Sequence, residues 1–131
     1  MNNKTRFISV LSSTLLFLTA SLSADAAGIR VRCDKTANRS KISVDGNDLV
    51  PGRYYRAQVI GYGPTKNKIT AWKRAVGDEV EFDLDSNPAD IRAGATSIPG
   101  NFIGSVPRVT GKFYNAKGYM VVSDTVACRR R

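Results

Sequence analysis

The sequence predicts an all-β protein, a single-domain antiparallel β-sandwich with one short helical turn. Apolar and polar residues alternate with a period of two in about seven short segments, and turn-forming residues separate these segments at fairly regular spacing. No long segment repeats its apolar residues with the period of a helix. The chain is long enough for one hydrophobic core and too short for two.

Residues 1–26 have the features of an export signal. Lys4 and Arg6 precede an apolar run that ends in small residues, and cleavage is expected after Ala26. A retained membrane anchor and a lipoprotein anchor are the alternatives, but serine and threonine interrupt the run and no cysteine follows the cleavage site. We therefore expect a periplasmic or secreted protein in which residues 27–131 form one β-sandwich domain, with no transmembrane segment left.

The expected mature chain is strongly basic. The whole chain has 131 residues, of which 20 are basic and 11 acidic, a net charge of +9. Removing the signal leaves 105 residues (131 − 26) and a net charge of +8 (18 − 10). Such a charge attracts anionic partners, for example an acidic polysaccharide or the envelope surface. We expect no nucleic-acid partner, because an exported protein seldom meets nucleic acid.

Two cysteines, Cys33 and Cys128, lie near the ends of the predicted domain. In an oxidising compartment such a pair is more often bridged than free, so we predict one disulfide that closes a loop of 95 residues (128 − 33). In the chain-entropy model this restricts the unfolded chain by roughly 4 to 5 kcal/mol. A metal site is the alternative, but two thiols in a chain without histidine fall short of the four ligands usual for zinc.

The first half of the domain contains three predicted strands, over residues 29–33, 40–44 and 54–62. Each alternates apolar and polar residues, and turns are expected at residues 45–48 and at Pro51-Gly52. The residues predicted to point inward are Ile29, Val31, Cys33, Ile42, Val44, Tyr55, Ala57 and Val59. The first strand therefore carries its cysteine toward the core.

The next predicted strand covers residues 68–72. Its alternation places Ile69 and Ala71 on one face and Trp72 on the other, so Trp72 is expected to point outward beside Lys73. Sugar-binding and nucleic-acid-binding proteins use outward aromatic residues near basic ones, and a sugar or envelope polymer suits an exported protein better. The alternative is that Trp72 packs against a loop or into the core.

Residues 79–85 form the clearest strand, because Val80, Phe82 and Leu84 alternate with acidic residues without exception. The acidic residues, Glu79, Glu81, Asp83 and Asp85, are expected to form a solvent-facing stripe. A neighbouring strand with basic residues would relieve their repulsion, and the candidates are Arg53, Arg56, Lys68 and Lys73. Paired carboxylates can also hydrolyse glycosides, but this exposed stripe gives no reason for one pKa to rise. We predict structural charge pairing.

A calcium site at the end of this strand is a further alternative. The candidate ligands are Asp83, Asp85, Asn87 and Asp90. Asp83, Asp85 and Asn87 match the start of a helix-loop-helix calcium loop, but Pro88 stands where that loop needs glycine and Gly94 where it needs glutamate. Asn87 can instead cap a short helix that begins at Pro88 and ends at Gly94. We therefore predict a capped helical turn without metal.

The chain ends in a predicted hairpin, with strands over residues 109–114 and 119–128 and the turn NAKG between them. A bridge to Cys128 would bring the arginines of the first strand close to those that end the chain. The candidate anion-binding residues are therefore Arg30, Arg32, Arg129, Arg130 and Arg131. The alternative is a solvated surface with a frayed C-terminal tail.

The strand number and alternation from Ile29 to Cys128 resemble those of immunoglobulin-like and fibronectin-type β-sandwiches. The resemblance implies two packed antiparallel sheets. It transfers no functional residue, because the cysteines lie in the outermost predicted strands and Val126 stands where antibody-type domains have a tyrosine.

The residues favour binding over catalysis. Histidine is absent and both thiols are expected in the disulfide, so the commonest base and a strong nucleophile are missing. The segment GYGPTKN lacks the ending of a phosphate-binding loop. We predict a non-catalytic exported binding module, without a cofactor, for an anionic envelope component or another exported protein. The alternatives are a small hydrolase using Asp and Glu carboxylates and a structural or assembly module.

Overall fold

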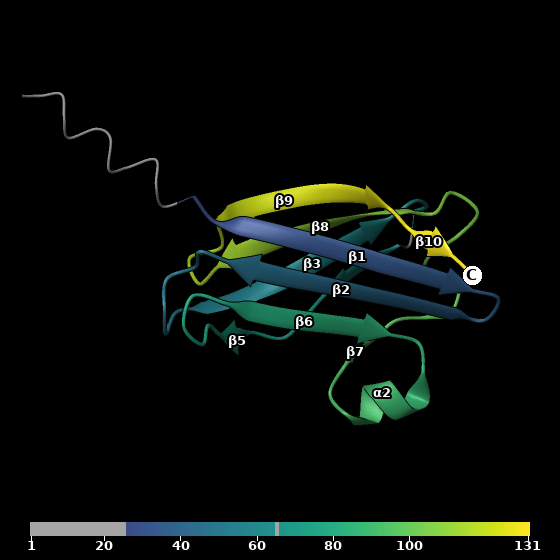
Figure 1. Cartoon of the computed structure of the whole chain (residues 1–131), viewed down its shortest axis with the longest axis horizontal. Coiled ribbons are helices and arrows are strands. Elements are labelled where there is room, and N and C mark those ends of the chain that lie inside the picture. The colour runs from purple at the N-terminus through teal and green to yellow at the C-terminus, as the bar shows by residue number, and fades with distance from the viewer. Residues whose placement is uncertain (1–25, 65) are drawn as a thin grey trace, which may run out of the picture.

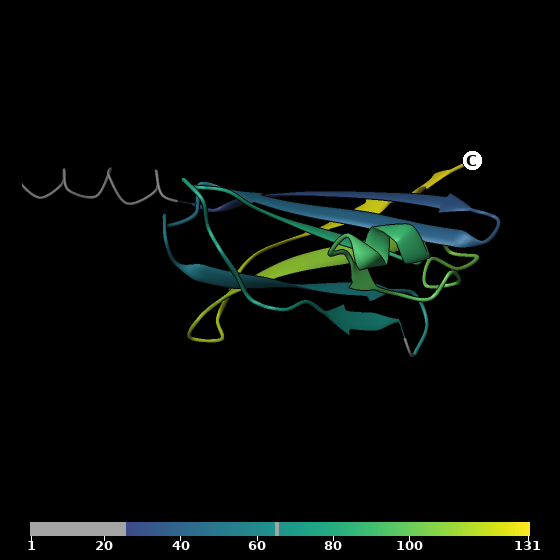
Figure 2. The same cartoon turned by 90° about the horizontal axis from the view of Figure 1, so that it is seen from below.

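The computed structural model describes residues 26–64 and 66–131. Within them the chain forms ten strands and one short helix, and the strands make two sheets that pack face to face (Figures 1 and 2). The predicted all-β sandwich is confirmed. The expected export signal lies outside the described residues except for Ala26. In the described part, no helix is long and apolar enough to cross a membrane.

The first sheet has the strand order β10-β1-β2-β6-β7. Its strands are β1 (Gly28–Thr36), β2 (Arg39–Asn47), β6 (Val80–Asp85), β7 (Thr96–Ser97) and β10 (Arg129–Arg130). The long strands are antiparallel, whereas β7 and β10 pair in parallel with β6 and β1. The turn expected from residue 45 starts later, because β2 continues through Gly46. A Cβ atom on Gly46 would lie 2.6 Å from the Phe113 ring, so this glycine permits close packing of the two sheets.

The second sheet has the order β4-β3-β8-β9, and β5 also pairs with β3. Its strands are β3 (Tyr54–Gly61), β4 (Asn67–Ile69), β5 (Lys73–Arg74), β8 (Arg108–Asn115) and β9 (Met120–Ala127). The predicted C-terminal hairpin is β8 and β9. In their order, β1, β2 and β6 correspond to strands A, B and E of one sheet of an immunoglobulin-like sandwich. Strands β3, β8 and β9 correspond to C, F and G of the other sheet.

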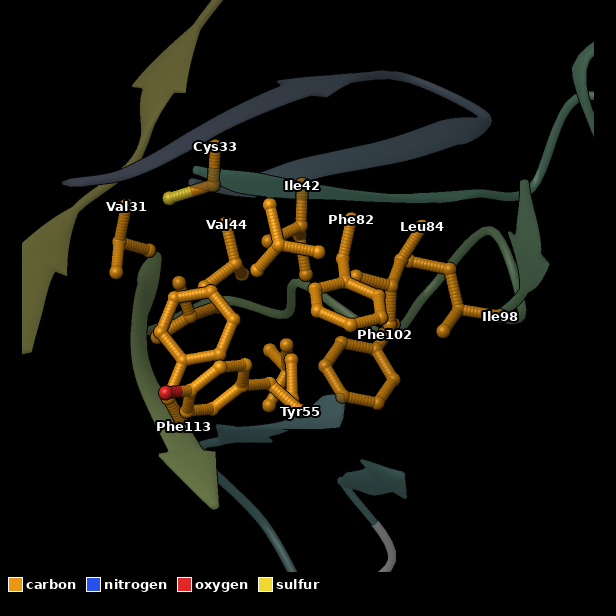
Figure 3. Close-up of a cluster of buried hydrophobic side chains, with 14 of the residues drawn as sticks. Val31, Cys33, Ile42, Val44, Tyr55, Phe82, Leu84, Ile98, Phe102 and Phe113 are labelled. Atoms are coloured by element: carbon orange, nitrogen blue, oxygen red, sulfur yellow. The ribbon is translucent and has the colours of Figure 1, made fainter. Parts of the chain in front are cut away.

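The core lies between the sheets and contains the predicted inward rows. In Figure 3 Ile42, Phe82 and Leu84 point toward Phe113 and Tyr55 of the opposite sheet. The Phe82 and Phe113 ring centroids are 5.7 Å apart. The inward residues predicted for β1, β2, β3 and β6 are buried, except for Ile29, which is half-buried and packs against the cluster.

The end of β4 differs from the prediction that Ile69 and Thr70 point inward and outward, respectively. Ile69 is 49% exposed and lies opposite Gln58, while Thr70 is buried. The Thr70 hydroxyl accepts the Ala57 N–H (2.9 Å), and the Thr70 N–H donates to the Ala57 carbonyl (2.9 Å). Because Ile69 is paired with Gln58, an outward residue of β3, the register turns the isoleucine to solvent and gives the inward position to Thr70.

The predicted disulfide between Cys33 and Cys128 is present, and both residues are buried. It joins the two sheets, since Cys33 lies in β1 and Cys128 directly follows β9. The residues after it form β10, in register with Asp34 and Lys35 of β1 (Figure 1). The C-terminal tail considered from the sequence is therefore paired with a strand and not frayed.

The predicted helical turn is α2 (Pro88–Arg92), drawn beyond the end of β6 in Figure 1. The Asn87 side chain accepts the Ala89 N–H at 2.9 Å, and Pro88 occupies the first turn. Gly94, with a φ of +118°, follows the C-terminal cap in a conformation that favours glycine. The capped turn is thus confirmed.

Candidate functional site

The outer face of the first sheet carries charges of both signs in neighbouring positions. Register places Arg30 opposite Asp45 and Asp34 opposite Lys41, while Arg32 forms an ion pair with Asp45 at 3.1 Å. On β6 the acidic stripe continues this face, and the Ser43 hydroxyl donates to Asp83 at 2.9 Å. Cross-strand pairs of opposite charge stabilise a sheet locally, so much of the charge on this face is balanced within the protein.

The prediction that Asp85 belongs to the solvent-facing stripe is wrong. Its side chain is buried and accepts two hydrogen bonds from Arg39, from Nε at 2.9 Å and from Nη2 at 2.6 Å. Burial raises the pKa of Asp85, but the hydrogen bonds from Arg39 and from the backbone of Asn87 and Ser86 outweigh it, so the pKa lies below its usual value.

The basic partners predicted for the stripe were also wrong. They were Arg53, Arg56, Lys68 and Lys73, none of which lies in the first sheet. Because β6 pairs with β2, the basic partner of Asp85 comes from the start of β2. Lys73 does reach β6, but its ammonium group donates to the backbone carbonyl of Glu81 at 2.8 Å.

The candidate calcium ligands make separate contacts. Arg39 bridges Asp85 and Asp90, with its Nη2 atom 2.9 Å from the Asp90 carboxylate. The Asn87 side chain caps α2, and Asp83 is bound by Ser43. Two of the four proposed ligands therefore already hold a permanent cation, the guanidinium group. In residues 26–64 and 66–131, no three His, Cys, Asp or Glu residues are grouped so that they could hold a metal ion.

The candidate anion-binding arginines lie along β1 and β10: Arg30 is near the start of β1, whereas the terminal arginines are beside Asp34 and Lys35 at its end. Arg129 and Arg131 both pair with Asp34, at 2.9 and 3.5 Å, and Arg32 pairs with Asp45. The hydrogen bond from Arg129 holds the pKa of Asp34 below its usual value. Arg130 reaches the carbonyls of Gly104 and Ser105 at 3.4 Å, and Arg30 is exposed. This group of candidate residues is basic, but three of its five arginines have a carboxylate partner.

The outer face of the second sheet carries basic charge without such partners. The inward rows of β3 and β8 contain Ala57, Val59, Gly111 and Phe113, so the alternate residues point outward. The outward basic residues are Arg56, Arg74, Arg108 and Lys112. Among the described strands of this sheet, the single acidic residue is Asp124, which lies opposite Gly111 and so belongs to the inward row. We call this outer face, with the aromatic residues Tyr54, Trp72 and Tyr114, the aromatic–basic face.

Arg56 is the centre of the aromatic–basic face. Its guanidinium carbon lies 4.5 Å from the centroid of the Trp72 ring, and Trp72 is 40% exposed. Tyr114 is its cross-strand partner on β8. The Tyr114 hydroxyl donates to Gln58 Oε1 and Gln58 Nε2 donates to Asn67 Oδ1, both at 2.9 Å. These contacts hold several side chains of the face in defined positions.

Sequence reasoning identified Trp72 but missed its stacking with Arg56, whose cross-strand neighbour is Tyr114. The alternation in β3 and β8 was sufficient to place both residues on a polar face. Their contact depends on the pairing of β3 with β8 and on the irregular course of residues 70–72, which a short alternation pattern does not reveal.

No protein-family model matches the chain, and no curated protein matches it. The argument for a binding surface therefore depends on the charges, contacts and exposure of this chain's own residues. Among the described residues, the carboxylates with lowered pKa values are Asp34 and Asp85, and both are held by arginines. Carboxylates in such ion pairs stabilise the fold, and neither pair lies on the aromatic–basic face.

Proposed function

We propose that the protein is an exported, non-catalytic binding module whose aromatic–basic face holds an anionic polymer of the cell envelope. One observation carries the proposal: four outward basic residues share the outer face of one sheet with an exposed tryptophan, and no acidic residue points outward on its described strands. Export is supported by the N-terminal sequence and agrees with the disulfide, because disulfides persist in oxidising compartments.

The shape of the face favours an extended polymer over a small enclosed ligand. Small ligands are usually buried in concave sites, whereas this face is the open side of a sheet. Arg108 and Lys112 are four residues apart on β8, which corresponds to about 14 Å along a strand. Lys112 lies diagonally across from Arg56, a separation of about 7 to 8 Å. A linear polyanion could contact these positions in succession.

Two matched double variants test the proposal, because each removes two positive charges from one face. Arg108→Gln with Lys112→Gln changes the aromatic–basic face, and Arg30→Gln with Arg32→Gln changes the first sheet. Binding of the disulfide-bonded protein to immobilised polygalacturonate is measured over a salt series, with neutral dextran as a control polymer. Losing two contacts of up to about 1 kcal/mol each should weaken binding about tenfold.

We expect the first variant to show this loss and a smaller dependence of affinity on salt, since it makes fewer ionic contacts. The second variant should bind within about twofold of the parent, because both of its positions lie on the outer face of the other sheet. A factor of two corresponds to about 0.4 kcal/mol. An equal or larger loss in the second variant would overturn the choice of face and support the cluster of Arg30, Arg32 and the terminal arginines. If the parent protein retains no anionic polymer, the proposed function is wrong.

A further inference from the structure

Arg56 differs from the arginines that stabilise the first sheet. Arg32, Arg39 and Arg129 each pair with a carboxylate, whereas no ion pair among the described residues includes Arg56. Its Nε atom is buried and has no hydrogen-bond partner in this part of the chain. A buried donor without an acceptor is unfavourable, so a folded protein that keeps one requires an explanation. A ligand that supplies the acceptor is one such explanation.

The surroundings of Arg56 hold the guanidinium group in place. It lies at 4.5 Å over the Trp72 ring, and the residue itself is on β3, which is paired on both sides. The neighbouring Tyr114 is oriented by its hydrogen bond to Gln58. Stacking of a cation on an indole restricts both groups, so less side-chain freedom is lost when a ligand binds. The position of Arg56 is therefore set before any ligand arrives.

A carboxylate is an anion that fits a fixed guanidinium. The planar guanidinium presents two parallel N–H groups along an edge, and a carboxylate accepts both. Binding along the Nε edge would give the buried N–H an acceptor. Because Nε is enclosed, such binding requires a small movement of the Trp72 indole. The exposed part of that indole offers an apolar surface on which a ring can stack.

We propose that Arg56 and Trp72 form a subsite for a uronic acid unit, whose carboxylate binds the guanidinium while its sugar ring packs on the indole. Lys112, on the same face of the neighbouring strand, would meet the next acidic unit of the polymer. The proposal depends on the proposed function and deepens it, since it specifies a polysaccharide with carboxylate groups. It makes selectivity for carboxylate a property of this one arginine.

Intrinsic fluorescence tests the subsite directly, because Trp72 is the chain's single tryptophan. The disulfide-bonded protein is titrated with an oligogalacturonate, with its neutral methyl ester, with sulfated dextran and with vesicles of anionic phospholipid. We expect a saturable change in emission with the oligogalacturonate, and at least about tenfold weaker binding of the methyl ester, a difference of about 1.4 kcal/mol. Tighter binding of sulfated dextran or of the vesicles would overturn the assignment to a uronate.

Two conservative variants then separate the subsite from general charge. Arg56→Lys keeps the positive charge but removes the planar pair of donors, and Arg30→Lys makes the same exchange at an exposed position on the outer face of the first sheet. We expect about a tenfold loss of oligogalacturonate affinity for the first and less than about twofold for the second. Equal small effects would overturn the role of Arg56 while leaving the proposed function intact.

Failure of the parent protein to bind any of the anionic probes would overturn both proposals. The comparison of the oligogalacturonate with its methyl ester needs only the parent protein. The carboxylate requirement is therefore tested even if Arg56→Lys does not fold.

Discussion

Replacing Asp85 with asparagine should destabilise the protein although the change adds or removes no atom of the apolar core. Asp85 is buried, receives two hydrogen bonds from Arg39, and also accepts the Asn87 N–H at 3.0 Å. The pair connects the start of β2 to the end of β6, next to α2. Removing one partner of a buried ion pair costs about 3 to 5 kcal/mol.

The effect should fall below that range for a structural reason. The Arg39 side chain keeps 35% of its surface exposed and a second contact with Asp90, so it can partly rehydrate after the change. The amide oxygen of asparagine can also still accept a hydrogen bond from the backbone of residue 87. We therefore expect Asp85→Asn to lower the free energy of unfolding by about 2 to 3 kcal/mol, the upper range for hydrogen bonds to charged groups.

Urea unfolding at pH 7 under non-reducing conditions measures this difference, with Asp83→Asn as the matched control. Asp83 is on the same strand but exposed, so its change should stay within about 0.5 kcal/mol. The pKa of folded Asp85 is lowered, so its stabilisation is fully present above the unfolded value of about 3.9 and is lost as pH falls through the folded value. The free energies of unfolding of the parent and of Asp85→Asn should therefore converge as the pH falls through this acidic window. Equal stability of the two proteins at pH 7 would refute the reasoning.

Two further predictions concern the disulfide and the packing of the sheets. A Cys33→Ser and Cys128→Ser double variant should lose up to about 4 kcal/mol of unfolding free energy, because the disulfide closes a loop across the whole domain. A loss below about 1 kcal/mol in urea unfolding would contradict the entropic argument. Gly111→Ala should cost about 1 to 3 kcal/mol, because the new Cβ would lie 2.8 Å from Val31 Cγ2. Gly104→Ala has no atom within 4 Å of the new Cβ and should leave the melting temperature nearly unchanged.

Local patterns were sufficient to predict most of the elements. Alternation identified the buried rows of β1, β2, β3 and β6, because one face of each strand packs on the core and the other does not. The cap of α2 was predictable as well, since the side chain of Asn87 acts on the backbone only two residues away. The same pattern failed at Ile69 and Thr70, because the register of β4 on β3 places Ile69 opposite the outward residue Gln58.

The candidate site was less predictable, because it depends on which strands are neighbours. Trp72 could be expected at the surface from its position in the alternation. Its stacking on Arg56 and the pairing of Arg56 with Tyr114 require β3 to lie between β8 and the edge strands, which local alternation does not encode. The same is true of Arg39, whose partner Asp85 is 46 residues away in the chain.

The sequence by itself determined that this protein is a strongly basic all-β sandwich with one disulfide. These properties depend on composition, on alternation within single strands and on the presence of two cysteines. Only the tertiary structure decided that Asp85 is buried against Arg39, and that the outer face of the first sheet balances its charges while the aromatic–basic face does not. The reason is physical: the energy of a charge depends on the groups within a few ångströms of it, and strand order chooses those groups.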